Sequence, residues 1–519
     1  MRTKPIILLA LLVASFVINL DTTLVNVALP TLVRELGATT SQLQWIVDAY
    51  NLVFAALLLT AGTCSDRFGR KGVLMIGLAV FGVASVAGGL TSSPSGLIAA
   101  RAVMGLGAAL TFPPTLSLLT NVFTERTERA RAIGLWGASA GVAIAMGPIV
   151  GGWLLEHYSW SSVFFIMGPV AAVTMALVAL SVPTSRSSVP GALDWVGLVT
   201  STLAMGLVVY TIIEAPTYGW GGGRTVGGFI MSAALFSGFI AWERRVPAPM
   251  LDVGLFSNMR FTAASASVTV SFFTLFGFIF LMTQYFQFIR GYGPLSTGVH
   301  LLPVALSVAV GSVIGTQAAV RFGTKAIVSI GLVAMSVFYV WVAGSISTTL
   351  GYWVISIQMV VYGLGMGLTS APATESIMGA VSDDEAGVGS AVNDSTRLLG
   401  GTLGVAVIGS IYASLFASRI ASTLTGRAPS TVVQTMQQSI GAALGVSRRV
   451  ASDGHIALGA TLRNVSTDAF LHGLSVGCMV AAGVAAAGAV LAVVFLPAQP
   501  PEEAAAQDAP PDDFATSLR

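Results

Sequence analysis

The sequence predicts an all-α membrane protein with fourteen transmembrane helices, arranged as two six-helix bundles plus two inserted helices. The chain of 519 residues is 54% hydrophobic and only 9% charged, whereas about 25% of the residues in a soluble globular protein are charged. Apolar runs of spanning length recur along almost the whole chain, and two short strings of residues occur twice. This composition excludes an ordinary soluble enzyme, a disordered chain and a basic nucleic-acid binder as descriptions of the whole chain.

The fourteen apolar runs are each near or above the roughly 20 residues that an α-helix needs to cross a bilayer. They must be helical, because lipid offers no partner to a free backbone N–H or C=O group. The first run lacks a cleavage pattern of small residues and extends through Asp21 to Pro30, so we interpret it as a retained helix and not a signal peptide. The predicted spans are 6–29, 43–62, 72–91, 97–120, 131–154, 162–182, 193–213, 225–242, 261–289, 297–319, 325–346, 352–374, 387–416 and 472–497.

The distribution of Lys and Arg predicts that both termini are cytoplasmic. With that orientation, the N-terminus and the short inner loops hold more than half of the 25 basic residues, and the short outer loops hold only Arg34, Arg224 and Arg290. This is the positive-inside pattern of a multi-pass protein of the cell membrane.

An internal repeat divides the chain. Residues 67–69 (Arg-Phe-Gly) return at 321–323, and residues 105–107 (Gly-Leu-Gly) return at 363–365. Two related six-helix bundles place a substrate site between them at the bilayer midplane. The predicted parts are a first bundle at 1–185, two inserted helices at 186–248, a second bundle at 249–499 with a long outer loop at 417–471 containing a short amphipathic helix, and a disordered cytoplasmic tail at 500–519.

Asp21 and Arg101 are among the ionisable residues within predicted spans, where a charge at the bilayer centre costs at least about 2.5–3.5 kcal/mol and indicates function. Asp21 lies in the first span, toward its outer end, with no basic neighbour in sequence. Such a setting disfavours the charged carboxylate, so Asp21 is a candidate for binding protons; the alternative is a hydrogen-bonded structural acid. Arg101, in the fourth span, needs carboxylate acceptors unless it extends outward to the interface.

Four further charged residues lie in predicted spans or at their ends. Asp48 faces either the mouth of a cavity or the interfacial zone at a helix start. Asp394 and Arg397 are three residues apart on one helix face, so they form either a structural pair or part of a proton pathway. Glu375 is expected to be a solvated residue at a span boundary.

The chain has no pattern typical of an enzyme or a metalloprotein. Its four histidines show no ligand spacing, its two cysteines, Cys64 and Cys478, indicate neither a disulfide nor a metal site, and the phosphate-binding loop of ATPases is missing from the sequence. We therefore expect an ion gradient as the energy source and no cofactor. The expected partners are a small-molecule substrate, protons and the lipid bilayer, with no nucleic acid and no obligate protein partner.

Residues 62–71 resemble the loop motif G-x-x-x-D-R-x-G-R-[RK] between spans 2 and 3 of the major facilitator superfamily. They match it at every defined position: Gly62, Asp66, Arg67, Gly69, Arg70 and Lys71. The resemblance implies a major facilitator fold in which this loop forms a gate latch between the bundles. Arg101 and Gly105 are similar to the superfamily's fourth-span motif, whose arginine is linked to proton transfer.

Other motifs resemble those of exporters in particular. The fifth span is similar to the antiporter motif, with Ala143 where a further glycine is expected; its matching residues are Gly134, Gly147, Pro148, Gly151 and Gly152. Glycines allow helices to approach closely, and proline bends a helix. Residues 20–30 and 249–256 resemble segments of the fourteen-span drug:proton antiporter family, whereas Ser161 and Met167 depart from its usual pattern. Asp48 within residues 45–50, together with Asp394, is similar to members that export quaternary-ammonium drugs.

The resemblance implies a proton-coupled secondary-active exporter of drugs, antibiotics or other amphipathic small molecules, cationic ones among them, and not an enzyme. The proton-coupling residues would be Asp21, Arg101, Asp48 and Asp394. An exporter of a lipid or cell-envelope metabolite with the same fold is an alternative, and a solute importer is disfavoured by the antiporter motif. Large apolar residues are expected to line the cavity: Trp45, Tyr50, Phe54, Phe112, Met282, Tyr285 and Phe286.

Overall fold

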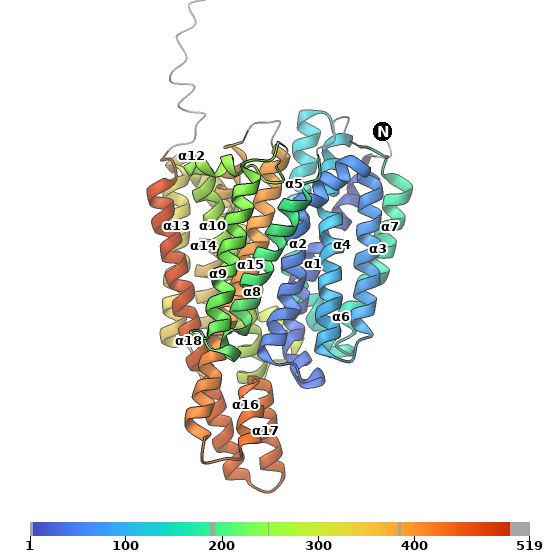
Figure 1. Cartoon of the computed structure of the whole chain (residues 1–519). Coiled ribbons are helices and arrows are strands. Elements are labelled where there is room, and N and C mark those ends of the chain that lie inside the picture. The colour runs from blue at the N-terminus through green and yellow to red at the C-terminus, as the bar shows by residue number, and fades with distance from the viewer. Residues whose placement is uncertain (1–3, 187–191, 248, 382–385, 499–519) are drawn as a thin grey trace, which may run out of the picture.

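A computed structural model describes residues 4–186, 192–247, 249–381 and 386–498 (Figure 1). Within these ranges the chain is helical and contains no β-strand. Fourteen helices are long and apolar enough to cross a membrane, which confirms the predicted all-α membrane fold. Arg2 and the predicted tail at 500–519 lie outside the described residues.

The N-terminal half contains the first six spans and the inserted pair. The sixth span is broken into α6 and α7. The helices are α1 (Lys4–Leu36), α2 (Thr40–Phe68), α3 (Arg70–Gly89), α4 (Pro94–Val122), α5 (Arg126–His157), α6 (Ser162–Phe165), α7 (Met167–Ser181), α8 (Trp195–Tyr218) and α9 (Gly223–Glu243).

The C-terminal half contains the last six spans. A π-helical turn extends α10, and a short helix precedes α12 in the same span. The elements are η1 (Val253–Ser257), α10 (Met259–Gln284), η2 (Tyr285–Ile289), α11 (Pro294–His300), α12 (Leu302–Phe322), α13 (Thr324–Ser345), α14 (Tyr352–Met378), α15 (Ala386–Leu424), α16 (Ser430–Gln437), α17 (Ile440–Ser452) and α18 (Ile456–Phe495).

The helices of each half pack mainly on one another. In the first half α2 and α3 pack on α4, and α1 packs on α5; in the second, α12 and α13 pack on α14, and α10 packs on α15. The inserted helices α8 and α9 pack together, and α8 contacts both α2 and α15. We call the end where α1 begins and α18 ends the terminal face, and the opposite end, which carries α16 and α17, the far face (Figure 1).

The sequence repeat is also a repeat of local structure. Gly69 and Gly323 occupy the tight turns between α2 and α3 and between α12 and α13, with φ of 108° and 86°. These positive φ values explain why both turns contain glycine. A methyl group on Gly77 of α3 would overlap Thr111 of α4, and one on Gly331 of α13 would overlap Thr369 of α14. Equivalent helix pairs therefore approach equally closely in the two halves.

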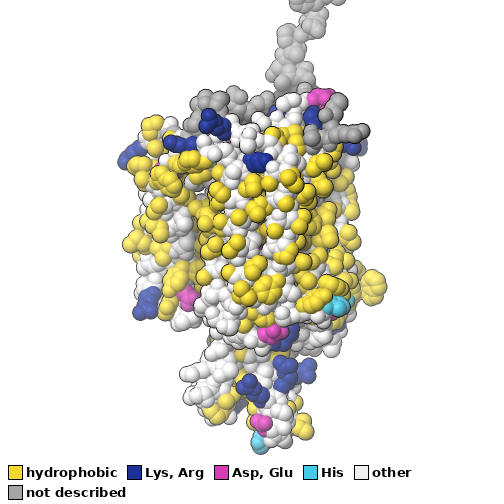
Figure 2. Space-filling model, turned by 90° about the vertical axis from the view of Figure 1, so that its right-hand side faces the viewer, with side chains coloured by type: hydrophobic (Ala, Val, Ile, Leu, Met, Phe, Trp, Pro, Cys, Tyr) yellow, Lys and Arg dark blue, Asp and Glu magenta, His cyan; other side chains and the backbone are white. Residues whose placement is uncertain are grey.

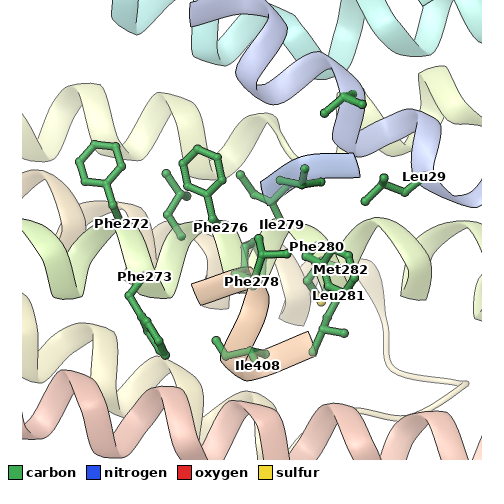
Figure 3. Packing of buried hydrophobic residues seen from close by; sticks show 14 of the residues in the cluster. Leu29, Phe272, Phe273, Phe276, Phe278, Ile279, Phe280, Leu281, Met282 and Ile408 are labelled. Atoms are coloured by element: carbon green, nitrogen blue, oxygen red, sulfur yellow. The ribbon is translucent and has the colours of Figure 1, made fainter. Parts of the chain in front are cut away.

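Apolar side chains fill the space between helices and cover the middle of the outer surface. Figure 3 shows Phe272 and Phe276 on one side of α10, with Phe273 pointing to the other side. Figure 2 shows hydrophobic side chains around the middle of the molecule and Lys and Arg side chains near its ends. This surface suits a protein surrounded by lipid tails.

The predicted outer loop at 417–471 is wrong as a loop, because most of it is helical. α15 continues to Leu424, and α18 already begins at Ile456. Between them, α16 and α17 replace the single predicted amphipathic helix. Ser439 separates them because its hydroxyl caps α17, accepting a hydrogen bond from the N–H of Ala442 at 3.2 Å.

Candidate functional site: a buried ion pair beside a central cavity

A buried ion pair joins α1 to α4. Arg101 donates a hydrogen bond from Nη1 to Asp21 Oδ2 at 2.5 Å, and both residues are 0% exposed. The same guanidinium donates from Nε to the Ile46 carbonyl of α2 at 2.9 Å, and its Cζ lies 4.3 Å from the ring centroid of Tyr50. Three helices thus meet at one guanidinium. Its carboxylate partner lies inside the protein, so the Arg101 side chain does not extend outward to the membrane interface.

The helix geometry brings these residues together. Asp21 lies near the middle of α1, because this helix runs on to Leu36, beyond the predicted end of the first span. Arg101 lies two turns inside α4, which starts at Pro94. One turn later, Gly105 lacks the side chain that would overlap the Tyr50 carbonyl, so α4 approaches α2 closely enough for Arg101 to reach across.

Asp48 occupies neither of its predicted positions. Its side chain is 0% exposed on α2, and it is not among the residues that line the cavity. Within the described residues, neither of its carboxylate oxygens has a hydrogen-bond partner. Thr39 and Thr40 form the start of α2, two turns earlier, so Asp48 does not lie at the start of the helix.

Asp394 and Arg397 form a looser pair at the terminal end of α15. Their Oδ1 and Nη1 atoms are 3.8 Å apart, and Arg397 also donates from Nη2 to the Thr374 hydroxyl of α14 at 3.2 Å. Both residues line the cavity, as does Glu375, which is exposed as expected. The pair therefore contributes charge to the cavity, unlike the enclosed pair of Asp21 and Arg101.

A cavity of about 640 Å³ lies between the two halves. Asn19 and Thr22, on either side of Asp21 in sequence, line it from α1, and Asn51 lines it from α2. Its lining continues to Glu375 and Asp394, near the terminal face. The aromatic side chains in its wall are Phe54, Phe112, Trp136, Phe272, Phe276 and Phe278.

Two of the seven residues predicted to line the cavity do so, Phe54 and Phe112. The other five are engaged elsewhere. Trp45 packs on Tyr210 of the inserted helix α8, and Tyr50 lies under Arg101. Met282, Tyr285 and Phe286 lie beyond the closed end of the cavity, fully or almost fully buried within the second half.

The loop motif forms contacts only within the first half among the polar contacts described here. Asp66 accepts a hydrogen bond from Arg70 Nε at 2.7 Å, and Lys71 donates to the Ala179 carbonyl of α7 at 2.8 Å. The Arg67 guanidinium lies 5.9 Å from the ring of Phe68. A methyl on Gly62 would be in ordinary contact with Pro113. The latch between bundles that the resemblance implies is thus not formed in this conformation.

The glycines of the α5 motif have two different environments. A methyl group on Gly147 or Gly151 would overlap α1, and one on Gly152 would overlap the start of α11. Pro148 lines the cavity, and its carbonyl touches Gly298 of α11. Gly134 has open space where a methyl group would lie, so the prediction of close helix contact fails at that position.

Contacts between the halves close the cavity toward the far face. The Gln287 amide donates to the Val27 carbonyl at 2.9 Å, and the Gln44 amide donates to the Val405 and Ala406 carbonyls at 3.1 and 3.0 Å. The N–H of Thr40 donates to the Gln438 carbonyl of the segment between α16 and α17 at 3.0 Å. No group of three or more His, Cys, Asp or Glu side chains suited to a metal occurs among the described residues.

Comparison with known proteins identifies the family. The model of the Major Facilitator Superfamily matches residues 11–405. The chain belongs to this superfamily. It is therefore a multi-pass membrane transporter and not an enzyme.

Curated relatives of this transporter are exporters and resistance proteins of bacteria. The multidrug resistance protein Stp of Mycobacterium tuberculosis is 33% identical over 79% of this chain and 76% of its own length. The tetracenomycin C resistance and export protein of Streptomyces glaucescens is 33% identical over 78% and 75%. The multidrug efflux pump LfrA of Mycolicibacterium smegmatis is 35% identical over 76% and 78%.

Solved structures share the fold of the transporter. A bacterial homologue of the human lysosomal transporter Spinster, in an inward-facing and occupied conformation, superimposes with a TM-score of 0.68 at 17% identity, covering 96% of this chain and 98% of that one. A D-xylose–proton symporter superimposes with a TM-score of 0.58 at 12% identity, covering 95% and 98%. At these identities the likeness concerns the fold alone.

Sequence reasoning did not find Trp136, Phe272 or Phe276, which line the cavity. The sequence does indicate that Phe272 and Phe276 share a surface, because Phe272, Phe276 and Ile279 are spaced as one face of a helix. Trp136 had no comparable signal, since its position depends on how α5 is turned relative to α4.

Proposed function

We propose that this transporter exports drugs or other amphipathic small molecules and that inward proton flow drives the export. One observation supports the proposal most strongly: Asp21 is buried in an ion pair while its neighbours Asn19 and Thr22 line the cavity. A single segment of α1 therefore faces the substrate on one side and a titratable pair on the other. Proton binding and substrate binding at this segment would influence each other.

Protonation of Asp21 would remove the negative partner of Arg101. The guanidinium would keep the Ile46 carbonyl and the Tyr50 ring but lose its only carboxylate among the described contacts. Removing one member of a buried pair typically costs 3–5 kcal/mol, which is comparable to the free energy separating two conformations of a protein. A proton at Asp21 is therefore able to shift the transporter between states.

Alternating access would follow from the arrangement of the seal. The cavity reaches the terminal face, and the far face is closed by Gln44, Gln287 and the close contact of Gly152 with α11. Rocking of one half against the other would break these contacts and open the far side, as in other transporters built from repeats. The loop at residues 62–71 would then form its latch at the terminal face.

The cavity favours neutral or cationic amphipathic substrates. Its volume of about 640 Å³ lies in the range of about 300–1,000 Å³ typical of sites for drug-sized ligands. Its walls are mainly apolar and include six aromatic side chains, and its charged lining residues are Glu375, Asp394 and Arg397, which leave one net negative charge. The names of the relatives, which concern multidrug efflux and antibiotic export, support drugs as the substrate class. A lipid or cell-envelope metabolite is the alternative.

The positions of the basic residues favour a cytoplasmic location for the terminal face. Arg67, Arg70 and Lys71 lie at the turn between α2 and α3, and Arg321 and Lys325 lie at the equivalent turn between α12 and α13. Cytoplasmic loops carry such excess positive charge. Both ends of the chain would then be cytoplasmic, and α16 and α17 would lie outside the cell membrane.

Transport by the purified protein in liposomes tests this function. With an imposed pH gradient, wild-type protein should move ethidium or puromycin against its concentration gradient, and an uncoupler should stop it. Asp21→Asn imitates the protonated acid and leaves Arg101 without its carboxylate partner. It should lower driven transport by at least about 100-fold, because no proton can be released at this position, while measurable substrate binding persists. The matched control is Asp468→Asn, which removes an exposed acid paired with Arg419. Efflux that survives the uncoupler, or full activity of Asp21→Asn, would contradict the proposal.

A further inference from the structure

A continuous row of aromatic rings connects the buried ion pair to the wall of the cavity. The ring centroids of Tyr50 and Phe54 are 5.9 Å apart, those of Phe54 and Phe112 are 5.8 Å apart, and those of Phe112 and Trp136 are 5.0 Å apart. All three distances lie within the 4.5–7 Å range of favourable aromatic pairs. The row crosses from α2 to α4 and then to α5.

One end of the row touches the ion pair. The Tyr50 ring lies under the Arg101 guanidinium at 4.3 Å, and the Tyr50 hydroxyl donates to the Ile18 carbonyl of α1 at 3.1 Å. A cation over an aromatic face is stabilised most strongly where water is excluded, and both residues are 0% exposed. Any shift of the guanidinium therefore requires the Tyr50 ring to move as well.

The other end of the row is part of the cavity wall. Phe54, Phe112 and Trp136 all line the cavity. The Trp136 indole N–H donates to the Thr115 hydroxyl of α4 at 3.1 Å, which limits how the ring can turn. A molecule that occupies the cavity presses on rings that cannot yield independently, because protein interiors are close-packed.

We propose that Tyr50, Phe54 and Phe112 transmit the occupancy of the cavity to the ion pair, with Tyr50 as a positioning residue for Arg101. Occupancy presses the row toward Arg101 and holds the guanidinium against Asp21, which weakens proton binding by Asp21. By linkage, a proton on Asp21 weakens the binding of substrate by the same factor. The inference rests on the proposed function, in which Asp21 carries the proton.

Few other groups influence proton binding by Asp21. Among the described residues, the charged or titratable groups that face the Asp21 carboxylate are Arg101 of α4 and Tyr50 of α2. Asp48 lies two residues before Tyr50 with no hydrogen-bond partner of its own among the described residues. From α5, the residues packed against this part of α1 are Ile144 and Gly147, and neither titrates.

The second half provides a matched control. Phe278 also lines the cavity, and its ring packs against Phe338 and Tyr362, each at 5.5 Å. That cluster ends at the Thr274 hydroxyl, which lies 3.1 Å from the Tyr362 hydroxyl. No charged residue is among these contacts. Replacing Phe278 therefore changes the cavity wall without interrupting the route to Arg101.

The test measures proton binding by Asp21 with the cavity empty and filled. Ala140→Cys, in full-length protein with Cys64→Ser and Cys478→Ala, places a thiol in the cavity wall, and alkylation with N-phenylmaleimide fills the cavity without a known substrate. Infrared difference spectra give the pH at which the protonated carboxyl band of Asp21 appears. Asp21→Asn identifies the band.

We expect alkylation to weaken proton binding by at least about fivefold, the lower range of couplings between sites. Phe54→Leu and Tyr50→Leu should reduce this change to less than twofold, whereas Tyr50→Phe, which keeps the ring, and Phe278→Leu should retain it. If Phe54→Leu or Tyr50→Leu fails to fold, Phe112→Leu is measured in its place. An undiminished change in Phe54→Leu would overturn the inference and leave the proton role of Asp21 intact. A band that never titrates in the unmodified protein would overturn both.

Discussion

In the N-terminal half, α4 passes α2 at Gly105, where a methyl group would overlap the Tyr50 carbonyl. In the C-terminal half, α14 passes α12 at Gly363, where a methyl group would overlap the Val304 carbonyl. Gly363 is the first glycine of the second Gly-Leu-Gly string, as Gly105 is of the first. Val304 follows Tyr50 by the same number of residues that separates the two Arg-Phe-Gly strings. The two halves therefore bring equivalent helices together at equivalent points.

The chemistry at these points differs completely. One turn before Gly105 stands Arg101, paired with Asp21, whereas one turn before Gly363 stands Met359, which is equally buried but apolar. Tyr50 lies under the guanidinium, and Val304 has no aromatic ring to offer. The comparison teaches that the duplicated framework supplies helix contacts in both halves, while among the described residues only the first half has a fully buried ion pair at this crossing.

The largest effect is expected from Arg101→Met, which gives the first half the residue type that the second half has at the equivalent position, Met359. Asp21 would be left buried without its partner, which typically costs 3–5 kcal/mol. We expect a strongly lowered midpoint of thermal unfolding in detergent and no proton-driven transport in liposomes. Adding Asp21→Asn should recover most of the stability, because no unpaired charge remains, but none of the driven transport.

Met359→Leu is the control for the same position in the repeat. It conserves volume in a buried apolar site, and such exchanges usually cost less than about 1.5 kcal/mol. Transport should persist. If Arg101→Met transported at the wild-type rate, the proposed division of roles between the halves would be lost.

An intermediate effect is expected from alanine at the two equivalent glycines. Gly105→Ala and Gly363→Ala both insert a methyl group against a backbone carbonyl, and overpacking of this kind costs about 1–3 kcal/mol. Both variants should therefore unfold at lower temperature by similar amounts. Only Gly105→Ala should also change the pH dependence of substrate binding, because it separates Arg101 from Tyr50.

Gly206→Ala in α8 is the control for these variants, since open space surrounds that glycine. It should leave stability unchanged or raise it slightly, given the higher helix propensity of alanine. An equal change in pH dependence for Gly105→Ala and Gly363→Ala would show that helix spacing, and not the position of Arg101, governs proton binding.

The same comparison explains how far the sequence predicts the structure. Spans, repeat and fold were readable, because lipid imposes length and composition on every helix and the strings around Gly69 and Gly323 recur. The need of Arg101 for a carboxylate was also readable, and the structure places it against Asp21. Each of these inferences rests on a constraint that acts on one helix at a time.

The lining of the cavity was predicted poorly because it depends on how helices turn relative to one another. Tyr50 and Phe54 are one turn apart on α2, yet the first lies under Arg101 and the second reaches the cavity. Tyr285 and Phe286 follow α10 in a π-helical turn, which alters the direction of side chains that helical spacing would predict. Residues 417–471 were predicted as a long loop with one short amphipathic helix. They instead form the end of α15, the helices α16 and α17, and the start of α18, and apolar residues of these helices join the hydrophobic core.

The smallest effect is expected at Asp394, one of the two acids that the second half contributes to the cavity lining. Its pair with Arg397 spans 3.8 Å and is partly exposed to the cavity, and pairs in contact with water add only about 0–1 kcal/mol to stability. Asp394→Asn should therefore leave the unfolding midpoint almost unchanged. It should weaken the binding of tetraphenylphosphonium about fivefold, since a unit charge about 4 Å away in water contributes about 1 kcal/mol. Binding of triphenylphosphine oxide, a neutral compound of related shape, should not change.

Added salt should reduce the difference in binding between wild type and Asp394→Asn, because salt screens a charge that is open to water. The enclosed pair of Asp21 and Arg101 should be insensitive to salt. Equal losses for the charged and the neutral compound would mean that Asp394 acts through packing and not through its charge.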